Sequence, residues 1–437
     1  MSSLGDTLNN KFVPAIMKFV NLKPVIALKD GIIYTLPLTL IGSVFLLLAQ
    51  LPYKPAAEFV SSRGWDGPLF QANGATMGVM AMIACVGIAY VYSKNEGHEP
   101  LSAGVIAFSI FCLTTNSYVI TEDGTKVGSV IPMDWTGGKG MVTAIIIGLI
   151  VGAVYSWFMK KNIRIKMPAG VPQGVADSFS ALIPGAVLIT GATILYAVLK
   201  MYDTTFIELI YKVLQTPLQG MTDSLGGVIA MGVLIPFLWF FGVHGATIVS
   251  GIMTPILTSN TLENGAIVSA GKELTLANGA HIVTQQFLDQ FMTVTGSGMT
   301  IGFVICMVFL SKSAQFKQLG TLSVVPAIFN INEPVLFGTP IVMNPMMAIP
   351  FISMPVISGV ILYFAIYTGI VPPFGGVLVP WTTPAIISGL LVGGVRTAIL
   401  QAAILILSVF VYLPFFKKCD SMSYENELAA NGSNVAE

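Results

Sequence analysis

Apolar stretches of the length of a transmembrane helix recur along the chain, separated by shorter polar segments. A helix needs about 20 mainly apolar residues to cross a bilayer. The pattern predicts an all-α integral membrane protein with about ten transmembrane helices and two re-entrant hairpins in the C-terminal half. The candidate spans cover residues 28–52, 69–92, 101–118, 139–159, 178–200, 225–243, 246–259, 298–311, 346–371 and 385–416.

Composition supports a membrane location. Of the 437 residues, 54% are hydrophobic and only 10% are charged, whereas about 25% of the residues of a soluble domain are charged. The formal net charge is zero, so no basic excess points to nucleic acid. The four cysteines are isolated and form no CxxC pair, which indicates neither a metal site nor a redox pair.

Clusters of basic residues orient the predicted spans, because lysine and arginine favour the cytoplasmic side of a membrane. Such clusters lie near the N-terminus, in the loop 160–166, at 312–317 and at Lys417-Lys418. They predict that both termini lie in the cytoplasm. Residues 4–23 carry apolar side chains on one helical face, with lysines among them, and predict an amphipathic helix at the membrane surface.

The two halves of the chain have different patterns. Residues 1–220 are mostly hydrophobic helices with short loops, and residues 221–416 alternate between apolar and glycine- or proline-rich polar stretches. Irregular backbone is tolerated within a membrane only where it is buried in protein or lines a cavity. We therefore expect a scaffold in 1–220, a transport domain in 221–416 with hairpins near 281–299 and 326–345, and a polar cytoplasmic tail in 417–437.

Glu333 is the first candidate for a functional side chain. Between Gln318 and Phe416 the only formal charges are Glu333 and Arg396, and a charge at the bilayer centre costs about 2.5–3.5 kcal/mol. One interpretation is a buried carboxylate, flanked by asparagine amides, that accepts hydrogen bonds from a polyhydroxyl ligand. The other is an ion pair with Arg396 that holds two helices. The first is favoured because Arg396 follows Gly393-Gly394, where a helix-end anchor would lie.

Three further side chains are weaker candidates. His244 is the only titratable group between Asp223 and Glu263, and it suits either a sugar hydroxyl or a place in the core. Trp381 suits either the apolar face of a sugar or the interfacial aromatic belt. Asp289 lies in the first predicted hairpin and has the alternative of simply facing water. No GxxxxGK[ST] loop is present, so we do not expect the chain itself to hydrolyse ATP.

Several motifs together resemble one family. They are Val171-Pro172 followed by SFSALIPG at 178–185, FLWFFGVHG at 237–245, and NINEPVLFGTPIVMNP at 330–345. This set is similar to the IIC membrane component of the bacterial phosphoenolpyruvate-dependent sugar phosphotransferase system, in its lactose/cellobiose/diacetylchitobiose branch. The resemblance covers nearly the whole chain.

The resemblance implies a homodimer joined by the N-terminal helices, in the bacterial cytoplasmic membrane, with the sugar held in the C-terminal half. Its sugar contacts correspond to matching positions in this chain, with Glu333 and His244 acting on the 6-hydroxyl: Trp239, His244, Asn278, Asn332, Glu333 and Trp381. It implies no cofactor.

The resemblance also implies partners. The phosphoryl donor is a phosphocysteine on a IIB component, and we expect IIB and IIA to be separate chains. The chain is then the permease component of a phosphocysteine–sugar phosphotransferase, and its substrate a β-linked disaccharide such as cellobiose or diacetylchitobiose. Two alternatives remain: an ion-coupled sugar symporter in which Glu333 carries a proton, and a non-transporting receptor or scaffold.

Overall fold

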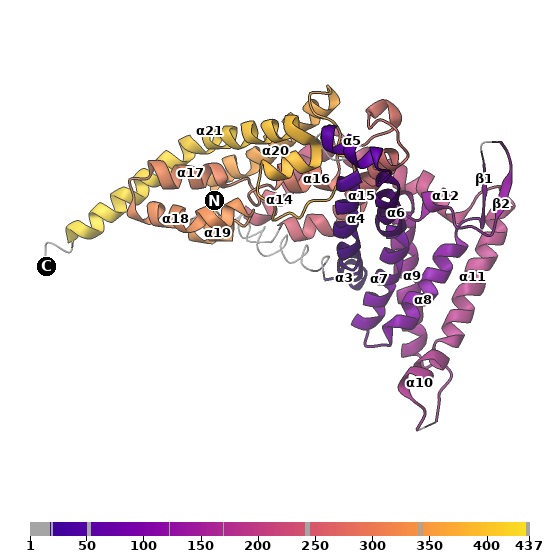
Figure 1. Ribbon diagram of the computed structural model, residues 1–437. Helices are drawn as coiled ribbons and strands as arrows, with labels where there is room; N and C mark the ends of the chain where they lie inside the picture. The colour runs from indigo at the N-terminus through magenta and orange to yellow at the C-terminus, as the bar shows by residue number, and fades with distance from the viewer. Residues whose placement is uncertain are drawn as a thin grey trace. The chain divides into compact units, whose positions relative to one another are not determined.

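The computed structural model describes residue 18 and residues 21–49, 54–121, 123–168, 170–240, 245–339, 341 and 344–433. These residues are helical apart from connecting segments and one short antiparallel hairpin of β1 (Tyr118–Ile120) and β2 (Lys126–Gly128). The predicted helical membrane fold is therefore confirmed (Figure 1). The amphipathic helix expected over 4–23 falls mostly outside the described residues.

The chain forms two compact units. The first contains Met1–Gln50, Glu58–Gly220 and Gly251–Ser269, and the second contains Leu51–Ala57, Met221–Ser250 and Ala270–Glu437. Three helices, α5 (Lys54–Ser62), α13 (Thr216–Thr222) and α15 (Gly245–Ser269), have residues in both. The scaffold and transport roles expected for the two halves stay predictions.

The first unit is built from mostly uninterrupted helices around α7. Besides the second parts of α5 and α15, the start of α13 and a π-helical turn at Tyr211–Gln215, its α-helices are α3 (Lys23–Ile33), α4 (Leu36–Ala49), α6 (Asp66–Thr76), α7 (Met80–Asn95), α8 (Pro100–Leu113), α9 (Met141–Lys160), α10 (Gln173–Ser180), α11 (Leu182–Lys200) and α12 (Phe206–Ile210).

Glycine allows α3 to approach α7 closely. A Cβ atom on Gly31 would lie 2.5 Å from the Ile88 Cα atom. In a bilayer, where burial of apolar surface does not drive helices together, small residues permit the close packing that holds helices in contact. α7 also packs on α8 and α9, so it forms the centre of this unit.

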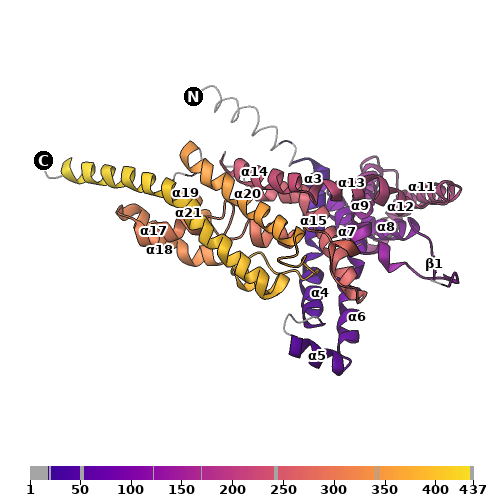
Figure 2. The same ribbon diagram turned by 90° about the horizontal axis from the view of Figure 1, so that it is seen from above.

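The second unit is built from helices interrupted by non-helical stretches at 293–300, 329–332 and 368–386. α14 packs on α20, and α17 packs on both α18 and α21 (Figure 2). Besides the start of α15, its elements are α14 (Leu225–Phe240), α16 (Gln285–Phe287), the π-helical turn η7 (Leu288–Met292), α17 (Ile301–Leu310), α18 (Ala314–Ile328), α19 (Glu333–Gly338), α20 (Pro345–Tyr367) and α21 (Ile387–Ser433).

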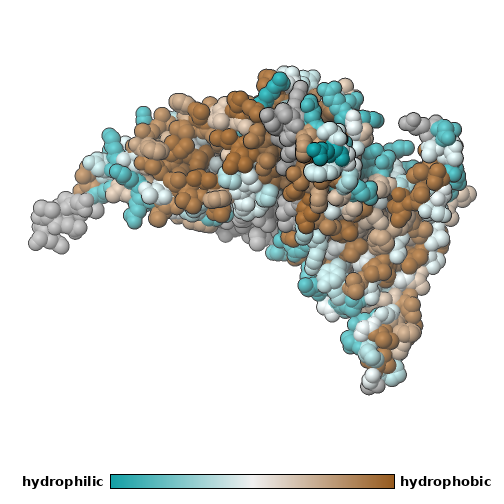
Figure 3. All heavy atoms as spheres, in the orientation of Figure 1, coloured by the Kyte–Doolittle hydropathy of each residue, from teal (hydrophilic) through white to brown (hydrophobic). Residues whose placement is uncertain are grey.

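Among the described residues, five helical stretches are long and apolar enough to span a membrane: Asp66–Asn95, Gly138–Lys160, Gln173–Lys200, Met346–Tyr367 and Ile387–Ala429. The first joins α6 and α7, and the third joins α10 and α11. A sixth arises if Phe206–Thr222 and Leu225–Phe240, bent by 71°, count as one. Most of the other predicted spans are shorter or broken in the structure, as where α8 has 14 residues and α17 has 10, whereas the span predicted at 246–259 lies within α15, which has 25 residues. Apolar side chains cover much of the surface of both units, as expected for helices in contact with lipid (Figure 3).

The end of α21 holds the start of α18. Asp420 accepts hydrogen bonds from the backbone N–H groups of Lys312 and Ser313 at 2.9 and 3.0 Å, and Glu427 accepts those of the next two residues. The first N–H groups of a helix have no partner within it, and carboxylates are favourable there. The polar stretch from residue 417 is thus helical as far as Ser433 and anchors the start of α18, whose last residues enter the hairpin predicted at 326–345.

Candidate functional site

Glu333 is the first residue of α19 and follows Asn332, which lies at the N-cap position. Its side chain is exposed, so the expectation of a buried carboxylate is wrong. A short helix that begins at the surface of this unit leaves its first side chain outside the core. Among the described residues, no side chain forms an ion pair or hydrogen bond with Glu333, and the alternative pairing with Arg396 is not formed.

Asn330 joins three non-helical segments. Its amide oxygen accepts the N–H of Thr295 at 2.6 Å, and its amide nitrogen donates to the carbonyls of Trp381 and, at 2.9 Å, Thr383. Its backbone has a φ of 64°, a left-handed conformation that asparagine tolerates better than most residues. Asn330 is one of the asparagines that flank Glu333 in the sequence, and its amide positions the segments around that residue.

Asn332 adds a second connection to the same turn. Its amide nitrogen donates to the Ser297 carbonyl at 2.7 Å and to the Thr300 hydroxyl at 3.2 Å, and its side chain is buried. The turn is unusual because Thr295 has a φ of 61°. A β-branched residue in the left-handed region is strained, and such strain concentrates at functional sites.

Three buried glutamines fix the stretch that carries Trp381. Gln286 accepts the N–H of Val379 at 2.9 Å, and Gln290 donates to the Val379 carbonyl at 3.2 Å. Gln401 of α21 donates to the Gln290 carbonyl at 2.6 Å and accepts the N–H groups of Ile386, just before α21, and Gly389, in its first turn. Non-helical backbone leaves its polar groups unpaired, so these amides replace the missing helical hydrogen bonds.

The sequence interpretation missed these three glutamines. They could have been identified as uncharged amides within apolar stretches of sequence, because such side chains in membrane proteins usually hydrogen-bond to other segments. Gln401, in the middle of an apolar helix, is the clearest case. The partners of the glutamines were not predictable, since they depend on which distant segments meet.

Two tryptophans frame the segment that begins at Glu333. Trp239, near the end of α14, is buried and packs edge-on against Phe337 of α19, with ring centroids 6.2 Å apart. Trp381 has 56% of its surface exposed, and its carbonyl is bound by Asn330. The structure therefore brings Trp239, Asn332, Glu333 and Trp381 to connected parts of the second unit.

The remaining candidates are not joined to this group. Asn278 is exposed in the turn Leu276–Asn278, and its amide donates locally to the Glu273 carbonyl at 2.8 Å. Asp289 accepts a hydrogen bond from Gln285 at 2.9 Å. His244 lies outside the described residues.

An exposed carboxylate beside segments joined by buried amides, with an exposed tryptophan on one of those segments, suits a ligand with both hydroxyl groups and apolar faces. The family model for "Phosphotransferase system, EIIC" matches residues 29–355. The chain belongs to this family. It is a IIC sugar permease of the lactose/cellobiose/diacetylchitobiose branch and a multi-pass membrane protein of a bacterial phosphotransferase system, as the motifs predicted.

Full-length similarity supports this assignment. The lichenan permease IIC component of Bacillus subtilis (strain 168) is 38% identical over 98% of this chain and 96% of that protein. The cellobiose-specific EIIC component of Geobacillus stearothermophilus is 38% identical over 97% and 95%. The crystal structure of ChbC, the IIC component from the N,N'-diacetylchitobiose-specific phosphotransferase system, has a TM-score of 0.90 at 36% identity and covers 96% of this chain and 99% of that one. As a IIC permease, the protein works with IIA and IIB components and a sugar.

Proposed function

We propose that this IIC permease imports a β-linked disaccharide, of the cellobiose or diacetylchitobiose type, and presents its 6-hydroxyl to a phosphocysteine on a separate IIB chain. The observation that carries the proposal is the Glu333 carboxylate. It is exposed, has no partner among the described side chains, and starts the helix that follows the segments joined by Asn330 and Asn332.

Glu333 acts in this proposal as the base. It accepts the proton of the 6-hydroxyl while the hydroxyl oxygen bonds to phosphorus, the S–P bond breaks, and the cysteine leaves as a thiolate. Phosphoryl transfer has a loose transition state, so catalysis depends mainly on positioning and electrostatics. A base must come within about 2.6–3.2 Å of the group that it deprotonates, which is why a rigid frame matters.

The other site residues bind the sugar. Trp381, which is exposed, packs against the apolar C–H faces of the pyranose rings, because indole offers a large flat surface with one polar N–H. Trp239, which is buried against Phe337, contacts the sugar only through the part of its ring that reaches the surface. Asn332 hydrogen-bonds to hydroxyl groups, Asn278 adds a weak contact from its exposed turn, and His244 helps to hold the 6-hydroxyl. The names of the similar proteins, which refer to lichenan, cellobiose and oligo-beta-mannoside, support a β-linked substrate.

Substitution of Glu333 tests the proposal. In vesicles supplied with phosphoenolpyruvate and the partner chains, Glu333→Gln should keep much of the sugar affinity but lower phosphorylation-coupled uptake about 10²–10⁴-fold, as for loss of a general base. Glu273→Gln is the matched control, because Glu273 is also exposed. If Glu333→Gln showed phosphorylation-coupled uptake at the normal rate, Glu333 would not be the base that accepts the proton of the 6-hydroxyl.

The same vesicles distinguish the ion-coupled symporter. Coupled phosphorylation delivers only sugar phosphate and stops without phosphoenolpyruvate. Accumulation of unmodified sugar driven by a proton gradient would favour the symporter. If Glu333→Gln did not change sugar uptake by cells, the result would support the alternative that the protein is a non-transporting receptor or scaffold.

A panel of disaccharides tests the substrate class. Purified protein should bind cellobiose or diacetylchitobiose more tightly than maltose, its α-linked counterpart. A preference for maltose would overturn the β-linked assignment.

We further propose that the permease is a homodimer joined by its N-terminal helices, with both termini in the cytoplasm. The mass of the protein in nanodiscs should correspond to two chains, and a cysteine placed in the polar tail should resist impermeant thiol reagents in intact cells. A single-chain mass, or labelling from outside, would contradict the respective statement.

A further inference from the structure

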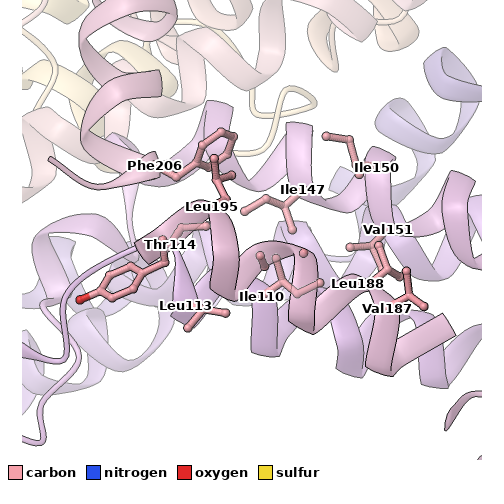
Figure 4. A pocket seen from close by; sticks show the side chains of 13 residues that line it. Ile110, Leu113, Thr114, Ile147, Ile150, Val151, Val187, Leu188, Leu195 and Phe206 are labelled. Carbon is pink, nitrogen blue, oxygen red and sulfur yellow. The ribbon is translucent and has the colours of Figure 1, made fainter. Parts of the chain in front are cut away.

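The first unit contains an apolar groove of about 260 Å³ that is remote in sequence from Glu333. It is lined by Ile110 and Leu113 of α8, Ile147 and Val151 of α9, and Leu188 and Leu195 of α11 (Figure 4). An engineered apolar cavity of about 150 Å³ holds benzene, so this groove has room for a segment of a hydrocarbon chain. It is open towards the outside, because Leu195 keeps 41% of its surface exposed.

One end of the groove adjoins a polar cluster. Thr114 and Phe206 lie at this end in Figure 4. Tyr196 also lines the groove, and its hydroxyl donates to the Asn116 amide oxygen at 3.0 Å. The same oxygen accepts a hydrogen bond from the Lys200 ammonium at 3.3 Å. The apolar lining thus continues directly into a cationic group.

Two lysines share one tyrosine in this cluster. Lys200 donates to the Tyr118 hydroxyl at 2.9 Å, and the Lys126 ammonium lies 3.9 Å from the centre of the Tyr118 ring. Among the described residues, neither lysine forms an ion pair with a carboxylate. An ammonium group has three donors, and Lys200 uses two of them, so one remains for an anionic oxygen.

We propose that this groove and the Lys126–Lys200 cluster form a binding site for an anionic phospholipid. One acyl chain occupies the groove, and the phosphate meets the two lysines at its polar end. The occupant must be both apolar and anionic, because one continuous site offers aliphatic side chains and two cationic groups without carboxylate partners. The site lies in the first unit and does not depend on the sugar-binding function of the second.

The groove can be filled without disturbing the backbone. A Cβ atom on Gly191, which lines the groove, would have no atom within 4 Å. Gly191→Leu should therefore occupy the place of the acyl chain. Thr193→Leu is the matched control, since Thr193 is exposed on the same helix and does not line the groove.

Native mass spectrometry of the delipidated full-length protein provides the test, with phosphatidylglycerol as the anionic probe and phosphatidylcholine as the neutral one. We expect phosphatidylglycerol to bind more tightly. Lys126→Gln and Lys200→Gln should each lower its affinity about fivefold and leave phosphatidylcholine unchanged, whereas Lys212→Gln should change neither. Gly191→Leu should weaken both lipids, and Thr193→Leu neither.

Three results would overturn the proposal. They are equal affinities of the wild type for the two lipids, unchanged binding in Gly191→Leu, and efficient disulfide cross-linking of Gly191→Cys between two copies of the protein. The last result would show that the groove faces another protein chain. Because the groove variant leaves both lysines in place, it tests the site even if a lysine variant fails to fold.

Discussion

Uninterrupted helices of the first unit approach one another through glycine, as at Gly31 and Ile88, whereas buried amide side chains hold the interrupted segments of the second unit. A continuous helix satisfies its own backbone hydrogen bonds, so its packing depends mainly on shape. A broken helix leaves N–H and C=O groups that need partners. The irregular backbone around Glu333 therefore depends on asparagine and glutamine side chains for its hydrogen bonds. Loss of an amide should be harmful in the second unit, and enlargement of a glycine should be harmful in the first.

The largest effect on transport, apart from that of Glu333→Gln, should come from Asn330→Ala. It removes three hydrogen bonds, each worth about 1 kcal/mol, and places alanine at a φ of 64°. Sugar affinity should fall by more than about tenfold, measured by calorimetry on purified protein. Hydrogen exchange in α7 of the first unit should not change.

A second substitution separates the loss of the amide hydrogen bonds from the backbone strain as causes of the lower sugar affinity. Asn330→Gly relieves the backbone strain but still lacks the amide, so it should lose nearly as much sugar affinity. Normal affinity in both variants would mean that the three segments hold their positions without Asn330.

In the first unit, Gly31→Leu should lower stability rather than sugar binding. Overpacking typically costs about 1–3 kcal/mol, so thermal unfolding should shift down by several degrees while the folded fraction binds sugar normally. Gly67→Leu is the control, because a Cβ atom there would meet nothing within 4 Å. A loss of sugar affinity in folded Gly31→Leu protein would show that helix packing in the first unit also affects sugar binding.

Asp420→Asn should have a local effect of about 1 kcal/mol, since it removes the charge from a helix N-terminus but keeps an acceptor. Hydrogen exchange should accelerate at Lys312 and Ser313, which directly precede α18. Glu425→Gln serves for comparison, because Glu425 is exposed and forms no hydrogen bond among the described residues. Equal rates of hydrogen exchange in Asp420→Asn and Glu425→Gln would show that the hydrogen bonds of Asp420 contribute little to the stability of this helix end.

The smallest effect expected from the geometry alone is that of Asn278→Ala. Asn278 is exposed and bonded only within its own turn, so sugar affinity should change less than about threefold, in line with a surface substitution. A large loss would instead support its place among the sugar contacts. Direct binding of a disaccharide decides between the two outcomes.

Much of the fold followed from the sequence because hydropathy and helix breakers are local signals. The apolar pattern predicted the helical membrane fold, and the glycines and prolines after Asn330 marked the broken region. The motif likewise identified Glu333 as a candidate. Its exposure could not be derived, because burial depends on how α19 lies against its neighbours rather than on the cost of an isolated charge.

The roles of the amides needed the structure for a similar reason. Asn330 and Asn344 look alike in sequence, yet one joins three distant segments and the other caps α20 through bonds to Met346 and Met347. A side chain that bonds to remote backbone gives no periodic signal. Sequence therefore located the site but not the contacts that shape it.

The hydrogen bonds of Gln401 and Asp420, both on α21 after its kink at Gly394, restrict how the chain can change in length. Gln401 holds one broken segment, and Asp420 holds the start of α18 on the same continuous helix. Insertion of one residue between them would rotate the two side chains relative to each other by about 100°, so at least one would lose its partner. Substitutions on the lipid-facing side of this stretch should be tolerated, whereas single-codon insertions and deletions should be rare among functional relatives.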